Sequence, residues 1–373
     1  MPILYLKMDN VLAFDNFEVS FSYPVKLRKT LIEEENLACR PTFRYKKVNI
    51  FIGSNATGKT SLMKCIWSIL LFLRNKERNN IDEILNNNGR ESTIVMDYAF
   101  EYDGEARLRR IIIKCIDGKL LMSSADLVIR EWDSYESRVK DLDSFNYEFA
   151  DYIECINSIE FTHGWNVTLP GTEKGFDAVK ILKLDDKDEE KDYFDILNRV
   201  LKTLDPSIVD VRKSNDAPDA IVIEHENTGI IIIQSGIRLS EINYLSSGTK
   251  YGINLSNVIF SIKYHHNGIY LIDEQLSYVN SDIECSILST IVSLIGPDEQ
   301  VFFTTHNDNI LELGFPFHSF YFMKKKYSNG KQKIAISCAT EVENRNNVPV
   351  RSILDNDMLG SAPDVSRIYE IGE

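Results

Sequence analysis

One segment constrains this chain more than any other: a glycine-rich turn that joins a short apolar run to a long amphipathic one. The turn has the spacing G-x-x-x-x-G-K-T, and its residues are Gly53, Ser54, Asn55, Ala56, Thr57, Gly58, Lys59, Thr60 and Ser61. Residues 48–52 are typical of a buried strand, and residues 62–73 repeat apolar side chains at helical spacing. This order predicts a phosphate-binding loop, because glycines let successive backbone N–H groups point at phosphate oxygens.

Two residues of this loop carry the chemistry expected of it. Lys59 would reach the β- and γ-phosphates of a nucleotide, and the Thr60 hydroxyl would bind Mg²⁺. The competing interpretation, an ordinary glycine-rich turn, is weaker because the flanking strand and helix are both present. The sequence therefore predicts that the chain binds ATP and Mg²⁺.

A second group of candidate residues follows two apolar runs far downstream. The run 269–272 ends in Asp273 and Glu274, and the run 301–305 ends at His306. We expect Asp273 to hold Mg²⁺ through water, Glu274 to polarise the attacking water, and His306 to contact the γ-phosphate. Acidic strand ends and capping histidines are common, so each signal taken alone also allows a structural role.

A helical pattern over residues 248–263 opens with Ser246, Ser247 and Gly248. Exposed N–H groups and the positive end of a helix dipole would suit an anion there. On spacing alone, a helix capped by a serine is the stronger interpretation.

Alternating strands and helices predict an α/β fold of the P-loop NTPase class. We expect a largely parallel sheet covered by helices, with antiparallel strands added by the N-terminal and central segments. We divide the 373 residues into an N-terminal ATPase part (1–117), a mainly helical insertion (118–240) and a C-terminal ATPase part (241–373). The insertion is expected to contain helices within 124–160 and 188–204 and a hairpin at 220–234. A further hairpin is expected at 318–338, turning at Ser328, Asn329 and Gly330.

Composition bears on which partners the chain binds and in which compartment it is found. The net charge is −14, which gives no overall basic footprint for nucleic acid, although a local basic patch remains possible. The start of the chain lacks the pattern of a signal peptide, and the apolar stretch 66–73 is too short to span a membrane. The six cysteines are scattered and have no zinc-binding spacing. We therefore expect a cytoplasmic protein with reduced thiols and no membrane association.

These motifs together resemble ABC-type ATPases of the SMC/RecF/OLD class. The match covers residues 1–116 and about 240–373, and the segment Ser246-Ser247-Gly248-Thr249-Lys250 is most similar to compact ATPase subunits of bacterial anti-phage systems, such as the PARIS ATPase and AbiL-like proteins. The resemblance implies that residues 53–60 are Walker A, 246–248 the signature motif, 273–274 Walker B and His306 the switch histidine. It also implies a head-to-tail dimer, or a larger homo-oligomer, in which the signature motif of one subunit closes over ATP bound to the other.

Two features depart from the family pattern. Asn280 stands where the family has an acidic residue or a histidine that links the two nucleotide sites, which predicts weakened coupling or slow hydrolysis. No glutamine typical of the family's Q-loop is recognisable between residues 90 and 120.

Three functions compete on this evidence. The leading one is an ATPase sensor or scaffold in phage defence that acts through a separate effector protein, a nuclease or toxin. It is favoured because the D-x-D pairs Asp186/Asp188 and Asp355/Asp357 lack the setting of a nuclease metal site. The second is a DNA-repair or chromosome ATPase that binds DNA through lysines of the 318–338 hairpin. A GTPase or small-molecule kinase is the weakest, since no N-K-x-D motif occurs.

Overall fold

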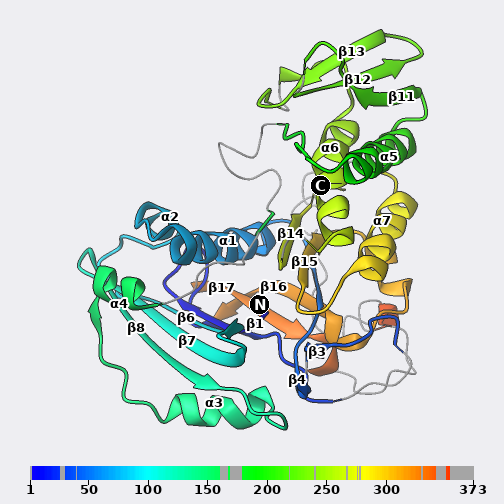
Figure 1. The fold of residues 1–373 in the computed structure, drawn as a ribbon. Coiled ribbons are helices and arrows are strands. Elements are labelled where there is room, and N and C mark those ends of the chain that lie inside the picture. Colours follow the sequence, from blue (N-terminus) through cyan, green and yellow to red (C-terminus); the bar gives the residue numbers. More distant parts are fainter. Residues whose placement is uncertain are drawn as a thin grey trace, which may run out of the picture.

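The chain folds around two separate β-sheets with a long helix between them (Figure 1). The structure is a computed structural model, and it describes residues 2–25, 30–38, 40–159, 167–168, 179–217, 219–238, 241–265, 268–274, 276, 279–328, 331–341 and 350–352. The expected turn residues Asn329 and Gly330 and the pair Asp355/Asp357 lie outside these ranges.

The first sheet is antiparallel, with the strand order β2-β1-β6-β7-β8-β9. Its strands are β1 (Ile3–Asp9), β2 (Phe17–Ser20), β6 (Ser92–Tyr102), β7 (Glu105–Ile116), β8 (Lys119–Val128) and β9 (Ala150–Asp151). The turn between β6 and β7 lies at Asp103-Gly104, where both residues have positive φ.

The second sheet has the order β10-β14-β15-β5-β16-β17 and is parallel except for the hairpin β16–β17. Its strands are β5 (Val48–Ile52), β10 (Val167–Thr168), β14 (Ile269–Asp273), β15 (Gln300–Thr305), β16 (Phe320–Ser328) and β17 (Lys331–Cys338). Two smaller sheets contain β3 (Asn36–Leu37) with β4 (Arg40–Arg44), and β11 (Ile208–Lys213) with β12 (Ala220–His225) and β13 (Gly229–Gln234).

Seven α-helices are described; α1 covers one face of the parallel sheet, and α6 and α7 cover the other. They are α1 (Lys59–Asn75), α2 (Asn79–Asp82), α3 (Tyr135–Asp143), α4 (Tyr152–Ser158), α5 (Lys187–Leu204), α6 (Ser247–Lys263) and α7 (Ser281–Leu294). Short 3₁₀ turns follow at η2 (Asp308–Glu312), η3 (Phe317–Ser319) and η4 (Ala339–Glu341).

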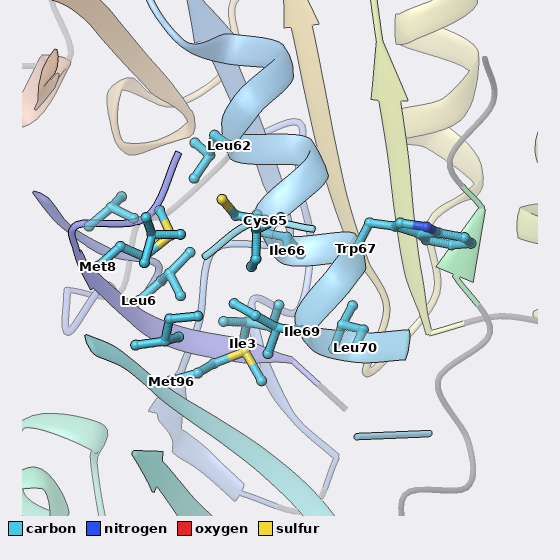
Figure 2. Packing of buried hydrophobic residues seen from close by; sticks show 14 of the residues in the cluster. Ile3, Leu6, Met8, Leu62, Cys65, Ile66, Trp67, Ile69, Leu70 and Met96 are labelled. Carbon is cyan, nitrogen blue, oxygen red and sulfur yellow. The ribbon is translucent and has the colours of Figure 1, made fainter. Parts of the chain in front are cut away.

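Helix α1 is buried between the two sheets. In Figure 2 its side chains Leu62, Cys65, Ile66, Ile69 and Leu70 face Ile3, Leu6, Met8 and Met96 of the antiparallel sheet, while Trp67 points to the opposite side. A helix that is apolar around most of its circumference is stable only when it is enclosed in this way. Each fully buried leucine or isoleucine contributes about 1.5–3 kcal/mol, so this packing holds the start of α1 firmly in place.

The strands of the parallel sheet divide their side chains between two cores. On β14, Ile269 and Leu271 join the core around α1, whereas Tyr270 and Ile272 join a second core with α6 and α7. This alternation follows from the two-residue period of a strand. Hydrophobic cores therefore pack on both faces of the parallel sheet and hold the strands that end at its carboxyl edge.

The structure corrects two expectations about the central segment. The helical pattern placed at 124–160 is wrong at its start, because residues 119–128 form β8, which pairs with β7 along its whole length. The antiparallel strands also form a sheet of their own and do not extend the parallel one. The helix expected at 188–204 and the hairpins expected at 220–234 and 318–338 are confirmed as α5, β12–β13 and β16–β17.

None of the described helices is long and apolar enough to cross a membrane. The five cysteines that the structure describes are free thiols, and two of them, Cys65 and Cys338, are buried.

Candidate functional site

The predicted site residues meet at the carboxyl edge of the parallel sheet. Strand β15 lies between β14 and β5, and all three run in the same direction. The loop that begins at Gly53, the pair Asp273-Glu274 and His306 therefore leave neighbouring strands on one side. Ligands of open α/β sheets bind at this edge.

The glycines of the loop are required by its geometry. Gly58 has φ +97°, a left-handed value that favours glycine, and a Cβ there would lie 2.4 Å from Cδ1 of Ile334. A Cβ at Gly53 would lie 2.4 Å from the backbone oxygen of Met323. The loop thus packs directly against the β16–β17 hairpin, and Thr57 donates a hydrogen bond from Oγ1 to the Ser54 oxygen, 2.8 Å away, which tightens its bend.

Lys59 is folded into the loop and is almost fully buried. Its Nζ donates to the backbone oxygens of Gly53 at 2.7 Å and Ser54 at 3.1 Å, and it lies 3.1 Å from Oε1 of Glu274. Burial lowers the pKa of Lys59, while the carboxylate of Glu274 raises it. The ammonium group is therefore held at the centre of the site by both the loop and the strand end opposite.

Glu274 connects Lys59 to His306. Its Oε1 also lies 2.9 Å from Nε2 of His306, and Nδ1 of His306 lies 3.4 Å from Nζ of Lys59. Glu274 has a left-handed backbone, with φ +48°. Such a conformation in a residue other than glycine costs about 1–3 kcal/mol and is typical of functional sites. Three residues widely separated in the sequence thus form one compact cluster.

Asp273 faces the hydroxyl of Thr60. Burial raises the pKa of Asp273, and hydrogen bonds from the hydroxyls of Thr304 and Thr60 favour its ionised form. The Thr304 hydroxyl lies 2.6 Å from Oδ1 of Asp273, and it also accepts the backbone N–H of Glu274 at 3.0 Å. Mg²⁺ usually takes one or two carboxylate ligands together with phosphate oxygens and water, so the pair Thr60 and Asp273 fits this ion.

The segment around His306 is fixed by a buried carboxylate that the sequence did not single out. Glu284 of α7 accepts hydrogen bonds from Oγ1 of Thr305 at 2.7 Å and Nδ2 of Asn307 at 2.9 Å. These are the two chain neighbours of His306. No motif in the sequence marks Glu284.

A cavity of about 520 Å³ opens beside the loop. Loop residues and Glu274 line one part of it, and Lys325, Lys333 and Ile334 of the β16–β17 hairpin line another. The sequence predicts that lysines of this hairpin form a candidate DNA-binding patch. Their position on the wall of the cavity could not be read from the sequence.

The signature segment lies elsewhere. Ser246 caps α6 by accepting the N–H of Thr249 at 3.1 Å, and Ser247 and Gly248 form its first turn. None of the three is among the described residues that line the cavity beside Lys59. Asn280 likewise caps α7, by accepting the N–H of Asp282 at 2.8 Å.

Comparisons with known proteins agree with this architecture at the level of the fold. No protein-family model matches the chain, and no curated protein matches it. An Smc head bound to the C-winged helix domain of ScpA is 14% identical, with 91% of this chain and 99% of that one covered at a TM-score of 0.52. An Smc head domain with an extended coiled coil, bound to the C-terminal domain of ScpA from Pyrococcus furiosus, is 12% identical, with 95% and 99% covered at a TM-score of 0.49.

An SMC head domain from Thermotoga maritima is also similar, with 14% identity, 91% and 99% coverage and a TM-score of 0.41. The chain has the mixed α/β fold of SMC heads, the ABC-type ATPase fold. The fold class expected from the sequence is confirmed, and the similarity to SMC heads is distant.

Proposed function

We propose that this chain binds and hydrolyses ATP at the carboxyl edge of its parallel sheet. The single observation that carries the proposal is the cluster of Lys59, Glu274 and His306 beside the pair Thr60 and Asp273. Nucleotide hydrolysis needs a cation for the phosphates, a group that orients water and a place for Mg²⁺. Lys59, Glu274 and the pair Thr60 and Asp273 are our candidates for these three tasks, and they lie close together.

Each residue has a defined task in this proposal. Backbone N–H groups of residues 54–60 hold the phosphates, and Lys59 neutralises their charge. Glu274 orients and polarises the attacking water, and His306 contacts the γ-phosphate. Thr60 and Asp273 would hold Mg²⁺, which when bound supplies further charge neutralisation at the β- and γ-phosphates. The Thr304 hydroxyl bonds both the Asp273 carboxylate and the backbone N–H of Glu274, so it fixes the position of one acidic residue relative to the other.

The first test removes the central cation. Lys59→Ala is expected to weaken ATP binding by about 10- to 100-fold, because the variant loses a charge-assisted contact to phosphate worth about 1.5–3 kcal/mol. Calorimetric titration with Mg²⁺ and ATP measures the effect, and Lys64→Ala, on the same helix but half-exposed, serves as the matched control. Equal affinity in Lys59→Ala and wild type would reject the site.

The signature segment supports a second part of the proposal. Ser246, Ser247 and Gly248 begin a long helix away from the cavity beside Lys59. We propose that they bind the nucleotide of a second copy in a head-to-tail homodimer or larger oligomer, where the free N–H groups and dipole of α6 would face a phosphate.

The cellular role that we favour is that of an ATP-dependent sensor or scaffold in bacterial phage defence, working in the cytoplasm with a separate effector. One observation supports a chain without nuclease activity of its own. Asp186 caps α5, accepting the N–H groups of Asp188 and Glu189, so this D-x-D pair has a structural task. The segment Ser246-Ser247-Gly248-Thr249-Lys250 also resembles that of compact ATPase subunits in such systems.

The alternative is a DNA-repair or chromosome ATPase, and it is favoured by the SMC-head fold.

The defence role predicts that cells that express the chain with its neighbouring gene resist phage, and that they lose this resistance when Lys59 is replaced by alanine. Plaque counts measure this. Salt-dependent DNA binding by the purified chain, together with unchanged plaque counts, would favour the alternative.

A further inference from the structure

The wall of the cavity formed by the β16–β17 hairpin carries a positive charge that the function proposed so far does not use. Lys325 and Ile334 are directly opposite each other in the hairpin, and Lys333 precedes Ile334. Ile334 would meet any Cβ added at Gly58, which shows how closely the hairpin approaches the loop. Both lysines are among the described residues that line the cavity, on the hairpin that approaches the phosphate loop at Gly58.

The charge balance of the cavity is opposite to that of the chain. The chain has a net charge of −14, yet the described residues that line this cavity include three lysines and one carboxylate, Glu274. Lys59 already neutralises Glu274 at 3.1 Å. Among the described lining residues the lysines thus outnumber the carboxylate, and a concave site lined mainly by one sign of charge concentrates the opposite ion.

Lys333 already holds an anionic oxygen. Its Nζ lies 2.6 Å from Oδ2 of Asp15, which also pairs with Arg90. Lys333, and after it Arg90, lower the pKa of Asp15 to about 2, so this carboxylate is ionised at neutral pH. Asp15 belongs to the loop between β1 and β2, whose Ala13 also lines the cavity. A carboxylate therefore competes for Lys333 at the edge of the site.

We infer that Lys325 and Lys333 form a second cationic wall that binds the phosphate chain of the nucleotide, and that Asp15 restrains Lys333. This inference rests on the proposed ATP site and adds a specificity for highly charged nucleotides. It gives these lysines a task other than DNA binding. Lys326 lies across the hairpin from Lys333, is exposed and is not among the described lining residues, so it marks the limit of the wall.

The experiment compares Lys325→Ala, Lys333→Ala and Lys326→Ala by calorimetric titration with Mg²⁺ and ATP, after a thermal melt has verified folding. Each of the first two is expected to weaken ATP binding by about fivefold to tenfold, as for a partly exposed charge-assisted contact. Lys326→Ala is the matched control and should remain within about twofold of wild type. Equal affinities for all three variants would overturn the inference.

Asp15 separates direct binding by Lys333 from an indirect effect. Asp15→Asn should bind ATP at least as tightly as wild type, because it releases Lys333. The double variant Asp15→Asn with Lys333→Ala should still bind less tightly than Asp15→Asn alone. If the two bind equally, the loss in Lys333→Ala comes from the unpaired Asp15 carboxylate, and the role of Lys333 is refuted.

The outcomes also distinguish this inference from the proposed function. If wild type binds no ATP, or Lys59→Ala binds it as well as wild type, both fail. If Lys59→Ala loses binding while Lys325→Ala and Lys333→Ala keep it, only the second wall fails. A gel shift with a DNA fragment completes the test, since lost DNA binding with unchanged ATP affinity would assign the lysines to DNA.

Discussion

Replacing Glu274 with glutamine is expected to lower ATP turnover by about 10²- to 10⁴-fold, the usual contribution of a positioned general base. Oε1 of Glu274 lies 3.1 Å from Nζ of Lys59 and 2.9 Å from Nε2 of His306, at the centre of the cluster. Glutamine has the same shape but cannot take a proton from water. Release of inorganic phosphate under saturating Mg²⁺ and ATP measures the change.

ATP binding should survive this substitution. The contacts of Lys59 with the loop do not involve Glu274, and the loss of a competing carboxylate leaves the ammonium group free for phosphate. The ATP-bound state should therefore accumulate, and with it the head-to-tail dimer. Light scattering with and without ATP measures the mass.

Asp282→Asn is the control for Glu274→Gln, because it removes an exposed carboxylate from the first turn of α7. It should hydrolyse ATP at the rate of wild type. If Glu274→Gln hydrolyses ATP at a rate close to that of wild type, Glu274 is not the general base. If the mass of Glu274→Gln does not change when ATP is added, the proposed dimer is contradicted, whereas the catalytic role of Glu274 is not.

The sequence predicted those site residues that belong to a short local motif, such as a glycine-rich loop or the end of an apolar run. The loop 53–60 is specified by its glycines, and Asp273 and His306 mark the ends of apolar runs. Because β5, β14 and β15 are parallel neighbours, their ends had to meet at one edge. The sequence could thus name these residues, and the strand order brought them together.

Features that depend on distant packing could not be read in this way. Residues 119–128 have an apolar run too short to distinguish a strand from a helix, and pairing with β7 decides the matter. Lys325 and Lys333 line the cavity because the hairpin that carries them packs on the loop at Gly58, which lies far away in the sequence. Glu284 supports the neighbours of His306 from a helix that carried no motif.

The antiparallel sheet contains another feature hidden from sequence reasoning, a buried ion pair between directly opposed strands. Asp97 of β6 accepts hydrogen bonds from Nε and Nη2 of Arg110 on β7, both at 2.7 Å, and from the hydroxyl of Tyr135 at 2.8 Å. Asp97 is fully buried. Charged side chains at these positions would ordinarily be expected in solvent, and only the pairing of β6 with β7 accounts for their burial.

Asp97→Ala is therefore expected to lower the free energy of unfolding by about 3–5 kcal/mol, because a buried guanidinium loses its main partner. Among the described carboxylates Arg110 would retain Asp143, 2.6 Å from Nη1 and largely exposed, and Tyr135 would lose its acceptor. Urea denaturation followed by circular dichroism measures the change as a lower midpoint.

Glu91→Ala is the matched control for Asp97→Ala. Glu91 precedes β6 and pairs with Lys114 of β7 at 3.0 Å, but both side chains are about one-third exposed or more. Exposed pairs contribute about 0–1 kcal/mol, so this variant should unfold close to wild type. The double variant Asp97→Leu with Arg110→Met should recover most of the loss, since it leaves no unpaired charge in the core. Equal midpoints for Asp97→Ala and Glu91→Ala would show that the buried pair contributes no more to the stability of the antiparallel sheet than the exposed pair does.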